Sequence, residues 1–138
     1  MKTTTTFSLL LLLVSSSLAA GPVQNKDSVE NFWQSFKTAV GKRDVDSVAR
    51  LSKFSLGMSY GIPSIRTKAQ LTKRYRQVFN EQTDAAACFA KAKPELDHET
   101  PKQFTVACPD EAGNEVVIYI FQYTRTGWKF TGLDNLNE

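Results

Sequence analysis

The 138-residue sequence contains a single histidine and only two cysteines. Zinc and iron sites usually need three or four His, Cys or carboxylate ligands, and His98 has no second histidine to join it. We therefore predict neither a metal nor a cofactor. The acidic residues fall mostly at predicted helix caps and turns. Nothing in the local sequence there provides the burial or the charged neighbour that would raise the pKa of a carboxylate enough for it to act as a base. Only Asp134 is expected near a pocket rim, so we predict no catalytic residue and lean away from an enzyme.

Long apolar runs are missing after the first twenty residues. The longest later ones, 85–90 and 116–121, are far shorter than the roughly 20 residues of a membrane-spanning helix. Residues 1–20 have the parts of a cleavable signal peptide: a basic residue, a short apolar stretch over 7–14, and small residues before Gly21. We predict cleavage near Ala20, export to the periplasm or the outside of the cell, and no stable membrane anchor afterwards.

The sequence also has little excess charge. Without residues 1–20, which hold one Lys and no acid, the 17 basic and 14 acidic residues become 16 and 14, a formal charge of +2. This is too weak to predict binding to nucleic acid. Basic residues gather in one predicted helical region, where their spacing indicates mainly a solvated face: Arg66, Lys68, Lys73, Arg74 and Arg76. Residues 21–138 have a common length for a single domain.

Three segments have the apolar spacing of helices. The first runs from about Asp27, which forms a capping box with Glu30, to Gly41. A second helix starts at Asp44 after a short break, and a third starts at Thr67 and ends near residue 80. Between the last two, residues 54–60 are predicted to be a short strand or extended segment.

Beyond residue 84 the pattern changes to the two-residue period of strands. We predict strands at 85–93, 103–109, 116–123 and 128–133. Helices followed by an antiparallel meander define an α+β fold.

The two cysteines fit this arrangement. If strands 85–93 and 103–109 form a hairpin, Cys88 lies directly opposite Cys108, which is within disulfide reach. Two buried free thiols are the alternative. An oxidising compartment favours the bridge, so we predict a disulfide between Cys88 and Cys108.

Several segments resemble the nuclear transport factor 2-like superfamily, a cystatin-like α+β cone that includes ketosteroid isomerase and scytalone dehydratase. The similar segments are VENFWQSFK at 29–37, DVDSVARL at 44–51 and GWKFTG at 127–132. The resemblance implies N-terminal helices packed on a curved antiparallel sheet, with a pocket open at one end. Enzymes of this superfamily use an Asp base, a His–Asp pair or Tyr donors, but these segments are not catalytic signatures, and fold alone does not decide function.

Aromatic residues are the remaining clue. On strand 116–123, alternation places Val117, Tyr119, Phe121 and Tyr123 on one face and the remaining apolar residues on the other. One face is expected to pack on the helices and the other to meet a pocket or a partner subunit. Placement of all the aromatics in the core is the alternative. The candidate pocket residues are Trp33, Phe36, Tyr60, Tyr75, Tyr119, Phe121, Trp128 and Asp134.

These observations favour a non-enzymatic, exported binding or accessory domain that holds a small apolar ligand or a protein partner against the aromatic face. One alternative is an isomerase- or dehydratase-like enzyme that uses Tyr60, Tyr119 and Asp134. The other is a structural homodimer that buries an exposed sheet face.

Overall fold

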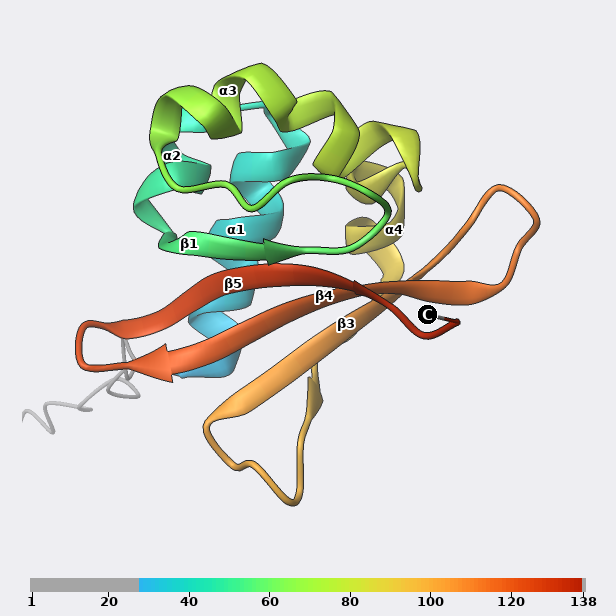
Figure 1. Ribbon diagram of the computed structural model, residues 1–138. Coiled ribbons are helices and arrows are strands. Elements are labelled where there is room, and N and C mark those ends of the chain that lie inside the picture. The colour runs from blue at the N-terminus through green and yellow to red at the C-terminus, as the bar shows by residue number, and fades with distance from the viewer. Residues whose placement is uncertain (1–27, 138) are drawn as a thin grey trace, which may run out of the picture.

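The computed structural model describes residues 28–137, so the predicted signal peptide and its cleavage site near Ala20 lie outside the described residues. Figure 1 shows the helices gathered on one side of a twisted, curved sheet of five strands. The helices are α1 (Val29–Gly41), α2 (Val45–Arg50), α3 (Lys68–Arg76), a π-helical turn η1 (Gln77–Glu81) and α4 (Ala85–Lys91). The strands are β1 (Ser52–Met58), β2 (Glu95–Leu96), β3 (Gln103–Pro109), β4 (Glu115–Thr124) and β5 (Gly127–Asn135). The predicted α+β class is confirmed.

The sheet is mixed, which corrects the prediction of a purely antiparallel one. Its strand order is β1-β5-β4-β3-β2, and the β3–β4–β5 meander is antiparallel as predicted. Strand β1 instead runs parallel to β5. Because three helical segments and the strands β2, β3 and β4 lie between β1 and β5 in the sequence, the chain can return beside β1 in the same direction.

The helix starts follow local capping chemistry. The cap of α1 is Ser28, whose hydroxyl accepts from the Asn31 amide, rather than the predicted Asp27. The Asp44 carboxylate caps α2, and Thr67 caps α3, both as predicted. Each of these side chains satisfies an amide that has no partner inside its helix.

The predicted strand at 85–93 is wrong, because this segment forms helix α4. Alanine is the strongest helix former, and the Asp84 carboxylate accepts from the Ala87 amide at 3.2 Å to cap the helix. Ala85 and Phe89 are fully buried one turn apart, so the apolar run has a helical face. The strand paired with β3 at this edge is the short β2.

The disulfide between Cys88 and Cys108 is present, but its geometry differs from the predicted one. It links α4 to β3, with a Cα–Cα distance of 5.8 Å, rather than two neighbouring strands. Cys108 is fully buried, whereas Cys88 is only half-buried. The bridge therefore fastens the helical layer to the inner face of the sheet. Within residues 28–137, no helix is long and apolar enough to cross a membrane.

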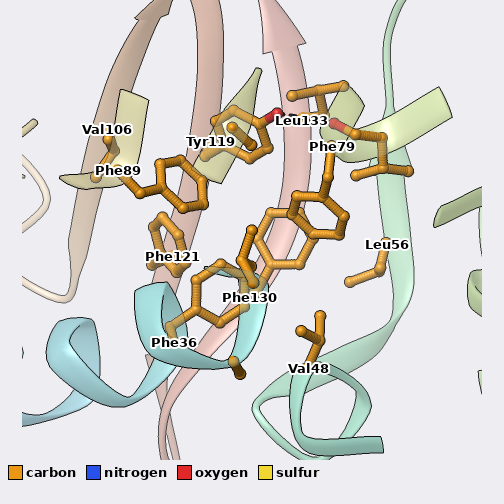
Figure 2. Close-up of a cluster of buried hydrophobic side chains, with 14 of the residues drawn as sticks. Phe36, Val48, Leu56, Phe79, Phe89, Val106, Tyr119, Phe121, Phe130 and Leu133 are labelled. Atoms are coloured by element: carbon orange, nitrogen blue, oxygen red, sulfur yellow. Dashed lines mark hydrogen bonds between the residues drawn. The ribbon is translucent and has the colours of Figure 1, made fainter. Parts of the chain in front are cut away.

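Aromatic rings fill the space between the helices and the sheet. Figure 2 shows Phe36 from α1, Phe79 from η1 and Phe89 from α4 directed toward rings of the central strands. The Phe36 and Phe121 ring centroids are 5.0 Å apart, and those of Phe89 and Tyr119 are 4.8 Å apart. Both pairs have the edge-to-face geometry that aromatic rings favour.

Candidate functional site

Six of the eight candidate pocket residues are buried in this core, at 9% exposure or less: Trp33, Phe36, Tyr75, Tyr119, Phe121 and Trp128. Their rings contact other rings of the same cluster; Phe121, for example, stacks on Phe104 with centroids 4.5 Å apart. These six positions are therefore parts of the packed interior, the alternative that the sequence left open. Tyr60 is partly buried at the edge of the core, and Asp134 is exposed.

The buried tyrosine hydroxyls are bonded to the backbone. Tyr119 donates to the Val78 carbonyl in η1 at 2.7 Å, and Tyr75 donates to the Val40 carbonyl at 3.3 Å. Burial raises the pKa of both tyrosines above the ordinary value of 10.0, and more strongly for Tyr119. A neutral hydroxyl held by a carbonyl stabilises the core.

The three residues of the enzyme alternative have separate partners. Tyr119 is bonded to η1, the Tyr60 hydroxyl donates to the Val116 carbonyl at 3.3 Å, and Asp134 accepts from the Ser59 hydroxyl at 3.1 Å. Asp134 therefore lies on the solvent side of the sheet, while Tyr119 points into the core. This arrangement does not favour a common reaction centre.

The face of the sheet away from the helices carries a hollow of about 470 Å³. Strand alternation explains its composition, since residues between the buried ones point to this side. We call this site the sheet hollow. Its lining is Lys53, Ser55, Gly57, Met58, Ser59, Gln103, Ile120, Gln122, Thr131, Gly132, Leu133 and Asp134.

Two glycines and a bulge shape the floor of the sheet hollow. Gly57 of β1 pairs with Gly132 of β5, and a Cβ on Gly132 would lie 2.6 Å from the Gly57 carbonyl oxygen. Only glycine therefore lets these backbones approach so closely. A Cβ on Gly57, by contrast, would meet nothing within 4 Å. The register of β4 and β5 shifts at Ile120, which leaves Thr131 as the extra residue of a β-bulge.

The Ser59–Asp134 pair lies at one end of the sheet hollow. Residues 57–61 have the sequence G-x-S-x-G, the pattern of a nucleophile elbow. The prediction of no catalytic residue overlooked this motif. The local structure differs from an elbow, because no helix starts directly after Ser59; residues 59–67 form turns and irregular backbone before α3. His98 follows β2 at the opposite edge of the sheet from β1. The Ser, His and Asp side chains therefore do not form a triad.

Charged groups elsewhere have ordinary surface roles. In the third predicted helix, Lys68 pairs with Asp46, and Arg76 pairs with Glu81 at 2.9 Å; both basic side chains are largely exposed to solvent. This confirms the solvated face expected from the sequence. In the part of the chain that the structure describes, no three His, Cys, Asp or Glu side chains gather closely enough to share a metal ion.

No protein-family model matches the chain, and no curated protein matches it in sequence. Solved structures resemble it in architecture. A variant of the protein Rd1NTF2_05 aligns with a TM-score of 0.48 and 11% identity, over 80% of this chain and 98% of that chain. A ketosteroid isomerase-like protein from Erwinia carotovora atroseptica aligns with a TM-score of 0.43 and 17% identity, over 80% and 94% of the two chains. This similarity concerns the overall arrangement of helices on a curved sheet and transfers no residue role.

Proposed function

We propose that this chain is a non-enzymatic, exported binding domain that holds its ligand in the sheet hollow rather than in the aromatic interior. The observation that carries the proposal is the contrast between the two faces of β4. Its inner side chains are packed against helix residues, whereas Ile120 and Gln122 line an open concavity. A volume of about 470 Å³ lies in the range of small-molecule sites.

The lining indicates the chemistry of the ligand. Hydroxyl and amide groups from Ser55, Gln122 and Thr131 surround a smaller apolar part formed by Met58 and Ile120. A ligand that combines several hydrogen-bonding groups with one apolar portion fits this surface. Lys53 and Asp134, near opposite ends of the parallel β1–β5 pair, have opposite charges, so the site has no strong preference for an ion of one sign.

Gly57 provides a test that fills the sheet hollow without touching the core. The Gly57→Leu variant adds a side chain where a Cβ meets open space. The matched control is Gly41→Leu, because Gly41 at the end of α1 also has nothing within 4 Å of an added Cβ. Both variants are expected to fold, as shown by far-UV circular dichroism and thermal unfolding.

The probe is a library of fragment-sized polar and apolar compounds, screened by NMR on the ¹⁵N-labelled protein. Compounds that bind are expected to shift the amide signals of Ser55, Gln122 and Thr131. Gly57→Leu is expected to abolish these shifts, and Gly41→Leu to preserve them. The proposal is overturned if no compound binds, or if the compounds that bind do so equally to the Gly57→Leu variant.

A homodimer is a second candidate, favoured by the half-buried side chains of Val116, Ile118 and Ile120 on the same outer face. A second copy seated there would cover apolar surface that water now contacts. Light scattering separates the two proposals. A dimer predicts twice the monomer mass for the unmodified protein and a shift to the monomer with Gly57→Leu, whereas a ligand site predicts a monomer in both cases.

A further inference from the structure

Gly57 of β1 is a glycine that the fold itself does not require. Its φ angle lies outside the left-handed region, and a Cβ on it would meet nothing within 4 Å. Its partner Gly132, by contrast, has no room for a Cβ. Glycine weakens a strand, and it often marks a place where a ligand or another backbone comes close. Because the close backbone approach needs glycine only at 132, a ligand in the sheet hollow would account for the exposed glycine at 57.

The two glycines leave a strip of bare backbone across the sheet hollow. Gly57 pairs with Gly132, and Gly132 pairs with Ile120 of β4. Two neighbouring strands therefore carry no side chain at this level, and we call Gly57 and Gly132 the glycine strip. Since neighbouring strands lie about 4.8 Å apart, Gly57 and Ile120 are roughly 10 Å apart across the sheet. A flat ring can lie on the peptide groups of the strip with its edge against Ile120.

Polar side chains lie on both sides of the glycine strip. Gln122 is two residues beyond Ile120 on β4, and Asp134 is two residues beyond Gly132 on β5; both line the sheet hollow. Because β4 and β5 are antiparallel, these two residues lie on opposite sides of the strip. At about 3.3 Å per residue, their backbones are roughly 13 Å apart along the strands. A ligand on the strip can therefore meet a polar group at each end.

Both polar ends have hydrogen-bonding capacity for a ligand. The Oδ1 atom of Asp134 accepts from the Ser59 hydroxyl at 3.1 Å and from the Asn135 amide at 2.8 Å, so its Oδ2 atom can accept from a ligand donor. At the other end, Gln122 Nε2 donates to Gln103 Oε1 at 3.2 Å. This bond leaves the carbonyl oxygen of Gln122 and the amino group of Gln103, an acceptor and a donor that together complement an amide.

We propose that the glycine strip binds a flat aromatic ring system with a hydrogen-bond donor at the Asp134 end and an amide at the Gln122 end. This inference rests on the proposed function, because it names the ligand class of the same sheet hollow. A saturated ring fits less well, since the hydrogens that project from its faces hold it away from the backbone. A gap of about 0.5–1 Å forfeits roughly a quarter to a half of the dispersion attraction.

The probes are 6-hydroxy-2-naphthamide and its decahydro counterpart, which carry the same polar groups on a flat and on a puckered skeleton. Each is titrated into the ¹⁵N-labelled protein and followed through the amide signals of Ser55, Gln122 and Thr131. The flat compound is expected to bind at least about fivefold more tightly.

The titrations separate failure of this inference from failure of the proposed function. If the puckered compound binds as tightly as the flat one, or if neither binds while other compounds of the fragment library do, the flat-ring inference is overturned and the proposed function stands. If no compound binds in the sheet hollow, both are overturned.

Gly57→Ala tests the floor of the site with the smallest possible side chain. The methyl group enters open space in the free protein, so thermal unfolding is expected to show no loss of stability. Because the same group lies where the ring would rest, it is expected to weaken binding of the flat compound by at least about fivefold. The matched control, Gly41→Ala, also adds a methyl group in open space and is expected to preserve binding. Equal affinities for Gly57→Ala and the unmodified protein would overturn the inference.

Asp134→Ala tests the donor end. The exposed position of Asp134 favours normal folding of the variant, which circular dichroism checks. The variant is expected to weaken binding of the hydroxy compound by about two- to tenfold. The affinity of 6-methoxy-2-naphthamide, which has no hydroxyl hydrogen to donate, is expected to stay the same. Equal losses for the two compounds, or no loss for the hydroxy compound, would overturn the assigned orientation of the ring on the glycine strip.

Discussion

The two faces of the central strands differ in almost every respect. On the inner face, Tyr119 and Phe121 are fully buried and touch rings from three helical segments. On the outer face, Ile120 and Gln122 border an open hollow lined by polar groups from four strands. The aromatic residues of this chain therefore build the fold, whereas polar residues and two glycines shape the surface on which binding is proposed.

The largest expected difference between the faces is in packing. Phe121→Ala removes a ring that contacts Phe36, Phe104 and Phe130, so we expect a loss of about 3–5 kcal/mol in the free energy of unfolding. Gln122→Ala, at the neighbouring outward position, is expected to cost about 0.5 kcal/mol or less. Urea denaturation measures both. Similar losses would show that the two faces are not energetically distinct.

The disulfide joins the helical layer to the inner face of the sheet, and no such link exists on the outer face within residues 28–137. The double variant Cys88→Ala and Cys108→Ala is expected to lose about 3 kcal/mol of stability, because the unfolded chain gains conformational freedom. Thermal unfolding of the reduced and oxidised protein gives an independent measure. Full reaction of both cysteines with a thiol reagent under denaturing, non-reducing conditions would contradict the bridge.

The inner face also contains a buried hydroxyl, that of Tyr119. Tyr119→Phe leaves the Val78 carbonyl without its donor, and we expect a loss of about 1–3 kcal/mol. Burial raises the pKa of Tyr119 above 10.0, so the folded protein keeps the proton at a pH where the unfolded chain releases it. Stability due to this group is thus present below pH 10 and declines as the pH rises above 10.

Denaturation of the unmodified protein and of Tyr119→Phe at a series of pH values tests this sign. The variant should lose less stability than the unmodified protein between pH 9 and 11. Parallel curves for the two proteins would mean that the buried hydroxyl does not control the response.

The smallest expected effect is on the outer face. Ser59→Ala removes the hydrogen bond to Asp134 and is expected to change stability by only about 0.5 kcal/mol, because both groups remain accessible to water. The measurement is the same urea titration used for Phe121→Ala. A loss as large as that of the core variant would show that the sheet hollow is part of the structural framework.

Local signals predicted the helix starts at Asp44 and Thr67 and the meander from residue 103 onward. The prediction was wrong at 85–93, because the periodicity of a short apolar run fits either a strand or a buried helix. The Asp84 cap and the three alanines that follow it favour the helix. The bridge between Cys88 and Cys108 was predicted through a hairpin that does not exist. It forms nevertheless, because α4 packs against β3.

Local sequence was sufficient to predict the elements whose causes are local: the caps of α2 and α3, the amphipathic stripe of α1 and the alternation of β4. Contacts between segments that are distant in the sequence decide which face of the sheet the helices cover and that β1 joins β5 in parallel. They also decide that Cys88 reaches Cys108 from α4, and that six of the candidate pocket aromatics fill the core. The physical reason is that packing is a property of two surfaces at once. A residue's own neighbours in the chain set its direction, but only the opposing layer determines whether it meets a ring, a carbonyl or water.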